Sequence, residues 1–115
     1  MAATGERDWI VFHGDDPNKQ LASGNGIDSL KAALPDDQCR FALYRCQGWL
    51  VRLHWKGPNC SAIKKVKSNG KLGGFSSSHP DSKTTVEVLA KGPLTDEAIW
   101  DRVKPGSGSK VIDDA

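Results

Sequence analysis

The residue types best suited to chemistry gather in one cationic run. Within residues 61–80 there are four lysines and no acidic residue, the lysines being Lys64, Lys65, Lys67 and Lys71. Most lysine runs are a solvated helix face. Here the run begins a predicted helix, whose amide end adds positive potential, so it also fits an acidic protein surface or a phosphoinositide head group. Nucleic acid fits less well, because Phe75 is the only aromatic side chain available for stacking in this run.

The sequence contains parts of three motifs that are typical of enzymes, but none of the three is complete. Gly24-Asn25-Gly26 supplies two glycines of a dinucleotide loop and no third, and Gly70-Lys71 precedes Leu72 where a phosphate loop needs serine or threonine. Gly74-Phe75-Ser76-Ser77-Ser78 lacks the last glycine of a nucleophile elbow. The histidines are scattered, and His54 alternates with apolar neighbours, which favours a structural role. The sequence therefore predicts no enzyme, no cofactor and no metal site.

The number and spacing of the cysteines indicate whether disulfides form, and therefore in which cellular compartment the protein is expected. Three cysteines are an odd number, which argues against a disulfide framework. Cys39 and Cys46 fall in one predicted strand, about 23 Å apart, too far for a bond. The N-terminus has no apolar signal core, and no apolar run approaches the roughly 18 residues of a membrane span. We expect a cytoplasmic protein without a membrane span.

Length and composition indicate a single domain. The chain has 115 residues, of which 37% are hydrophobic and 26% charged, and its net charge is +2. This size supports one core and not two. A charge so close to zero does not demand a nucleic-acid partner.

Periodicity and turn signals give the expected elements. Strands are predicted at residues 8–13, 19–23, 41–44, 49–55 and 83–90, and Gln47-Gly48 forms a two-residue hairpin between the two central ones. In the strand 49–55 the odd-numbered side chains point one way, and Arg52 and His54 the other. A helix capped by Asn25 and another capped by Thr95 precede stops at prolines. The fold class predicted is α+β, a mixed five-stranded sheet flanked by helices.

The stretch after Ser61 is expected to be a short helix. Ala62, Ile63 and Val66 are predicted to face the sheet. Three glycines and several serines oppose helix further on, so we expect the helix to end within residues 70–74, with a mobile loop up to Asp81. The polar segment 106–115 is predicted to be a flexible tail.

Taken in order, these segments resemble the actin-depolymerising-factor homology (cofilin/coactosin-like) family, and coactosin most. The resemblance spans about residues 8–110. It rests on Trp9-Ile10-Val11-Phe12, Gly24-Asn25-Gly26, Phe41-Ala42-Leu43-Tyr44-Arg45, Leu53-His54-Trp55-Lys56-Gly57, Ala62-Ile63-Lys64-Lys65-Val66-Lys67 and Ile99-Trp100-Asp101-Arg102-Val103. It implies an extension at residues 1–7, the domain at 8–105 without the family's N-terminal helix, and the tail at 106–115.

The resemblance also implies a function. A monomeric cytoskeletal protein would bind the sides of actin filaments rather than monomers, through Lys64, Lys65, Lys67 and Lys71, and would modulate filament dynamics. The shortened helix predicts weak monomer binding and weak or no severing. The alternative is a degenerate member that binds another protein or an acidic lipid, such as a phosphoinositide, without actin. A small basic nucleic-acid binder is the third interpretation.

Overall fold

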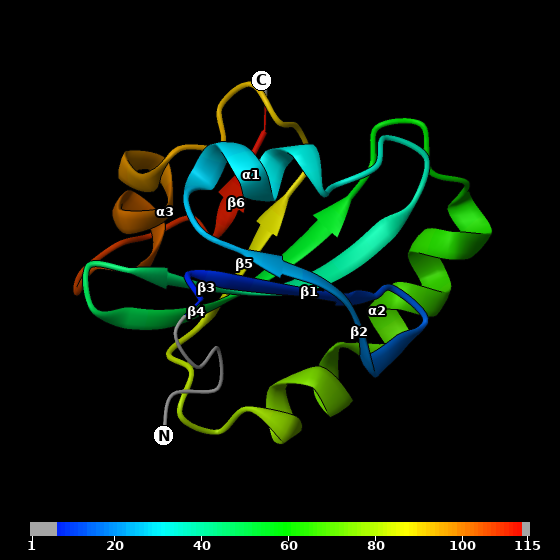
Figure 1. The fold of residues 1–115 in the computed structure, drawn as a ribbon, viewed down its shortest axis with the longest axis horizontal. Helices are drawn as coiled ribbons and strands as arrows, with labels where there is room; N and C mark the ends of the chain where they lie inside the picture. The colour runs from blue at the N-terminus through cyan, green and yellow to red at the C-terminus, as the bar shows by residue number, and fades with distance from the viewer. Residues whose placement is uncertain (1–6, 114–115) are drawn as a thin grey trace.

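Residues 7–113 are described in a computed structural model (Figure 1). Its strands are β1 (Trp9–His13), β2 (Asp16–Gly24), β3 (Cys39–Cys46), β4 (Trp49–Lys56), β5 (Thr85–Val88) and β6 (Val111–Ile112). Its helices are α1 (Ile27–Ala32), α2 (Ala62–Ser78) and α3 (Asp96–Val103). The predicted N-terminal boundary of the domain, including the absence of a first helix, lies largely outside the described residues.

The strands form one mixed sheet in the order β2-β1-β3-β4-β5-β6. Neighbours from β2 to β4 run antiparallel, whereas β4–β5 and β5–β6 are parallel. The sequence predicted about five strands, and the sixth lies in the segment expected to be a flexible tail. That expectation is wrong at Val111–Ile112, because Ile112 pairs with Val88 and is fully buried. Strand β6 was not predicted because it has only two residues and lies in a polar, glycine-rich segment.

The central hairpin is confirmed. Gln47 and Gly48 both have positive φ, at 52° and 77°. Two consecutive left-handed residues are the mark of a type I′ turn, whose twist matches that of the strands it joins. The predicted alternation along β4 is also confirmed, since Val51, Leu53 and Trp55 enter one core while His54 faces the opposite side.

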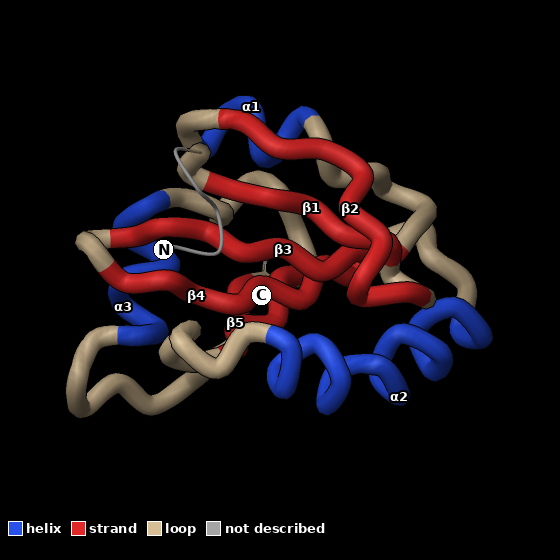
Figure 2. The backbone as a smooth tube through the Cα atoms, turned by 60° about the horizontal axis from the view of Figure 1, so that its bottom comes forward, coloured by secondary structure: helices blue, strands red, loops and turns tan. Residues whose placement is uncertain are grey.

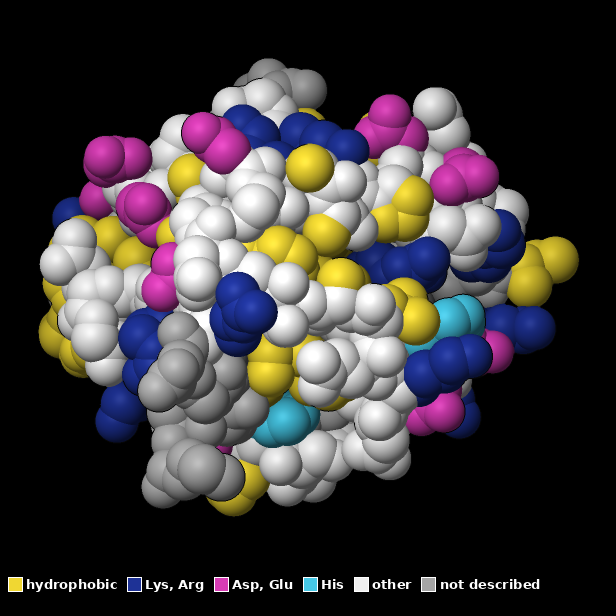
Figure 3. All heavy atoms as spheres, viewed as in Figure 1, with side chains coloured by type: hydrophobic (Ala, Val, Ile, Leu, Met, Phe, Trp, Pro, Cys, Tyr) yellow, Lys and Arg dark blue, Asp and Glu magenta, His cyan; other side chains and the backbone are white. Residues whose placement is uncertain are grey.

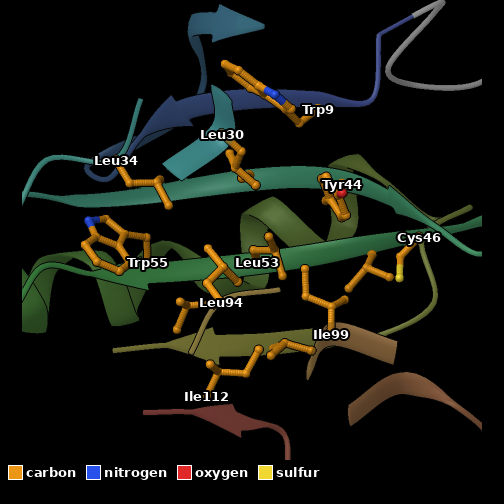
Figure 4. Close-up of a cluster of buried hydrophobic side chains, with 14 of the residues drawn as sticks. Trp9, Leu30, Leu34, Tyr44, Cys46, Leu53, Trp55, Leu94, Ile99 and Ile112 are labelled. Atoms are coloured by element: carbon orange, nitrogen blue, oxygen red, sulfur yellow. The ribbon is translucent and has the colours of Figure 1, made fainter. Parts of the chain in front are cut away.

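The larger core lies between the sheet and helices α1 and α3. In Figure 4 its side chains converge from both layers, with Leu53 and Trp55 of β4 among those of the helices. Trp55 is 1% exposed, and its indole Nε1 donates to the backbone oxygen of Pro35 at 2.7 Å. Trp55 is therefore a core residue on the face that the odd-numbered side chains of this strand were predicted to share.

Helix α2 covers the opposite face of the sheet (Figure 2). Phe75 is fully buried there, and its ring packs on Phe12 and Phe41 with centroids 5.6 and 4.8 Å away. Leu72 packs on the edge of the same cluster. Within residues 7–113 the fold is therefore three layers, with α1 and α3 on one side of the sheet and α2 on the other.

Two predictions about α2 are wrong. The helix does not end within residues 70–74 but continues to Ser78, and Ile63 and Val66 do not face the sheet, since they are 70% and 69% exposed. The inward face instead carries Ser68, Leu72 and Phe75, spaced i, i+4 and i+7. Tertiary packing of this face outweighs the poor helix propensity of the glycines.

The helix caps are partly as predicted. Thr95 caps α3, with its hydroxyl accepting from the Ala98 amide at 3.1 Å. Asn25 does not cap α1: Gly26 is the N-cap, and the Asn25 side chain accepts from the Asp8 amide instead. Within residues 7–113, none of the helices combines the length and the apolar character needed to cross a membrane.

Candidate functional site

The outward side of α2 carries an exposed ridge that faces away from the sheet. It begins with Ile63 and Val66 and continues one turn at a time through Gly70, Gly73, Gly74 and Ser77; we call these six positions the α2 ridge. At 100° per residue they lie opposite the inward face of Ser68, Leu72 and Phe75. The ridge is apolar at its start and nearly bare of side chains further along.

Three of the predicted lysines line one flank of this ridge. Lys64, Lys67 and Lys71 follow each other at i, i+3 and i+7 and are all exposed. Lys65 lies on the other flank and is half-buried, so it is set apart from the other three. Among residues 7–113 no ion pair involves any of these four lysines. Their charge is therefore available to a partner.

The start of α2 concentrates this positive charge. Ser61 caps the helix, with its hydroxyl accepting from the Lys64 amide at 3.3 Å, and the first turn holds no acidic residue. The helix dipole adds its positive end there. At the right-hand edge of Figure 3, where Figure 1 places the start of α2, hydrophobic and cationic side chains lie side by side.

A pocket of about 150 Å³ adjoins the same turn. Cations border it from two elements, Lys64 and Lys67 from α2 and Arg40 from β3. The remaining lining residues are His13, Gly14, Asp15, Gln38 and Cys39. The Arg40 guanidinium donates to the Cys39 carbonyl oxygen at 2.8 Å, and although burial lowers its pKa, arginine keeps its charge. The pocket is net cationic despite the Asp15 carboxylate.

A buried polar contact fixes α2 from beneath. The imidazole of His54 and the hydroxyl of Ser68 are hydrogen-bonded, and the ring of His54 stacks on Phe41 at 4.7 Å. Burial, with a further contribution from the Lys56 cation, lowers the pKa of His54 to about 4. His54 is therefore neutral near pH 7, and its role is to hold the helix, in agreement with the structural role expected from the sequence.

Two features of the site were not predicted. The exposure of Ile63 and Val66 was missed, although the spacing of Ser68, Leu72 and Phe75 sets the helix phase and places both residues outside. The contact between Cys39 and Cys60, whose sulfur atoms lie 3.2 Å apart, was missed because the two residues belong to different elements. Within the described part of the chain, no three metal-binding side chains come together.

These observations define a class of protein: a three-layer α+β domain with a cationic face on the single helix that covers one side of its sheet within residues 7–113. A family profile described as "Cofilin/tropomyosin-type actin-binding protein" matches residues 2–104. The chain belongs to this family. Membership confirms the fold class and the family predicted from the sequence, and it agrees with the prediction of a non-enzyme.

Solved structures share the fold. Cofilin from Streptomyces griseoflavus superposes with a TM-score of 0.74 at 18% identity, covering 87% of this chain and 84% of its own. Coactosin from Entamoeba histolytica gives 0.67 at 24% identity, covering 86% and 81%. Mouse coactosin, described as an actin filament binding protein, gives 0.71 at 15% identity, covering 89% and 78%. No curated protein sequence matches the chain significantly.

Proposed function

We propose that this chain is a coactosin-like actin-binding protein that contacts actin through the α2 ridge and its flanking lysines. The observation that carries the proposal is the exposure of Ile63 and Val66, at 70% and 69%, on a helix that is otherwise well anchored. Large aliphatic side chains this exposed, rimmed by unpaired cations, are typical of a binding surface. The family assignment supplies the partner.

The two kinds of side chain have different tasks in this proposal. Burying an aliphatic side chain contributes roughly 1.5–3 kcal/mol, so Ile63 and Val66 would provide affinity. The lysines would attract an acidic surface and select the partner, so binding depends on them as well, and salt screens their effect. Binding should therefore weaken clearly between about 50 and about 200 mM salt without disappearing.

The preference for filament sides rests on the coactosin resemblance alone. Mouse coactosin is described as an actin filament binding protein, and its fold matches this chain over most of both lengths. A broken helix cannot be the cause of weak severing, because α2 is continuous to Ser78. We expect filament-side binding with little severing, in the cytoplasm and on the cytoskeleton, and imaging of single filaments tests the severing.

Co-sedimentation with actin filaments tests the binding surface. Replacing Lys64, Lys65 and Lys67 together by alanine should abolish most binding while leaving the unfolding midpoint nearly unchanged, since surface lysines without an ion pair change stability by only about 0.5 kcal/mol each. The matched control removes the same charge elsewhere, at Lys31, Lys91 and Lys104, and should bind almost like the wild type. Equal binding by both triple variants would show that the assigned surface is wrong.

A second variant separates the apolar part of the ridge from its charge. Ile63→Ser with Val66→Ser should reduce binding at high salt as well as at low salt, because it removes apolar area and no charge. Both side chains are exposed, so stability should stay within about 0.5 kcal/mol per change. A large loss of stability would instead place both residues in the core and contradict the exposure of the ridge.

An acidic lipid is the second candidate partner. The pocket brings Arg40 next to Lys64 and Lys67, three cations around a volume that fits a small anionic group. Co-sedimentation with vesicles that contain a phosphoinositide, compared with vesicles of equal charge made with phosphatidylserine, tests it. Arg40→Gln should lower binding only to the phosphoinositide vesicles. Equal binding to both kinds of vesicle would exclude a specific head-group site.

A further inference from the structure

Two of the three cysteines meet at the base of α2. The sulfur atoms of Cys39 and Cys60 lie 3.2 Å apart, and both thiols are free. Cys39 begins β3, and Cys60 directly precedes Ser61, the N-cap of α2. The third cysteine, Cys46, is at the other end of β3, where its thiol donates to the backbone oxygen of Asp96.

The backbone holds the Cys39–Cys60 pair in place. The Gly57 amide donates to the Gln38 oxygen at 3.1 Å, and the Asn59 amide donates to the Asp36 oxygen at 2.8 Å. Gly57 permits this approach, because a Cβ there would lie 2.2 Å from the Asp36 oxygen. The segments that directly precede the two cysteines are therefore hydrogen-bonded to each other. A disulfide needs a sulfur–sulfur distance of about 2.05 Å, and rotation about the two side chains has only to close the remaining gap.

We propose that Cys39 and Cys60 form an intramolecular disulfide when the protein meets a peroxide. Hydrogen peroxide first oxidises Cys60, the more exposed of the two residues, to a sulfenic acid and is reduced to water. The Cys39 sulfur then attacks the Cys60 sulfur, the S–O bond breaks, and the leaving hydroxide takes the Cys39 proton as a second water. Two thiols and one peroxide thus give one disulfide and two waters.

Access and reactivity set the pace of this reaction. Cys60 is 7% exposed and Cys39 is 3% exposed, and Cys39 also borders the pocket beside Lys64 and Lys67. Burial raises the pKa of the Cys39 thiol to about 11, so near pH 7 little of Cys39 is in the thiolate form that attacks the Cys60 sulfenic acid most readily. The disulfide should therefore form slowly, under sustained oxidation.

The bond would tie the first turn of α2 to the central sheet. It closes a loop of about twenty residues, and a cross-link of this span restricts the unfolded chain considerably. The midpoint of thermal unfolding should rise on the order of 10 °C on oxidation. This proposal does not depend on actin binding.

Mass spectrometry of the full chain treated with hydrogen peroxide tests the proposal. After denaturation and alkylation, we expect one alkylated cysteine, Cys46, and a digest in which the peptide containing Cys39 is linked to the peptide containing Cys60. Dithiothreitol should restore three alkylated cysteines. Cys46→Ser should leave the cross-link intact, whereas Cys60→Ser should abolish it.

Several results would overturn the proposal. These are a cross-link that includes Cys46, a cross-link between two chains, or oxidation of single cysteines to sulfinic acid with no cross-link. If Cys60→Ser fails to fold, the wild type alone remains decisive, because the linked peptide and the reversible rise in the unfolding midpoint are both measured on the unaltered chain.

Discussion

Replacing the three ridge glycines by alanine should stabilise this protein. Gly70, Gly73 and Gly74 lie inside α2 with φ below zero, and a Cβ built at any of them meets no other atom within 4 Å. Alanine therefore introduces no clash and no strain at these positions. It restricts the unfolded chain and favours the helical backbone, so the gain comes from the difference between the two states.

The magnitude follows from helix propensities. Each glycine costs about 0.8–1.0 kcal/mol relative to alanine inside a helix, so the triple variant should gain about 2–3 kcal/mol. The unfolding entropy of a chain this long is about 0.24 kcal/mol/K, from roughly 2.1 cal/mol/K per residue. The unfolding midpoint should then rise by roughly 10 °C.

Calorimetry and urea denaturation measure this gain. The matched control is Gly57→Ala, where the new Cβ would lie 2.2 Å from the Asp36 oxygen and should destabilise the domain. A triple variant no more stable than the wild type would refute the reasoning, because it would show that the chain beyond Gly70 is not helical in solution. Actin binding should fall in the stabilised triple variant if the partner approaches the bare backbone of the ridge.

Three further predictions concern the layers beneath α2. Lowering the pH from about 7 toward 4 should cost about 3 kcal/mol of stability through His54, because burial lowers its pKa from 6.5 to about 4 and the folded state resists protonation. In urea denaturation, His54→Gln should lack this part of the loss. An unchanged pH dependence would contradict the assignment, because burial also lowers the pKa of His79, and His79 is present in both proteins. Ser68→Ala should cost about 1–3 kcal/mol by leaving His54 without its partner, measured by urea denaturation against Ser77→Ala on the ridge. Trp55→Ala should cost on the order of 3–5 kcal/mol in the same assay, and a variant with an unchanged midpoint would show that this indole is not in the core.

Local signals were sufficient to predict the centre of the fold. The alternation of Trp49, Val51, Leu53 and Trp55 fixed one face of β4, and Gln47-Gly48 fixed the turn, because strand period and hairpin geometry are properties of a few adjacent residues. The N-cap of α3 at Thr95 could also be predicted, because a hydroxyl, two acidic residues and an apolar stripe fall within two turns. These elements agree with the structure.

The errors arose where tertiary packing decides. Propensity alone ends α2 at its glycines, yet burial of Phe75 on Phe12 and Phe41 outweighs a cost of about 1 kcal/mol per glycine. The same packing sets the rotation of the helix and turns Ile63 and Val66 outward. The lysines were found because charge is visible in the sequence, whereas the exposure that completes the candidate site depends on which residues the sheet buries.

The β3–β4 hairpin has a consequence for how the chain folds. It is closed by two residues, and it is the local unit onto which β1 pairs from one side and β5 from the other. Such hairpins form within about 1–10 μs, whereas the parallel pairing of β4 with β5 must wait for the crossover through α2. We therefore expect β3 and β4 to pair first and the outer strands of the sheet to join them later.

The last step in this order is the docking of β6. Only two residue pairs join it to β5. Its side of the sheet should accordingly be the first to open in the native state, with amide hydrogens near Ile112 exchanging well before those near Ala42. Strand β6, which was not predicted from the sequence, would thus be the last strand to form during folding and the first to open in the native state.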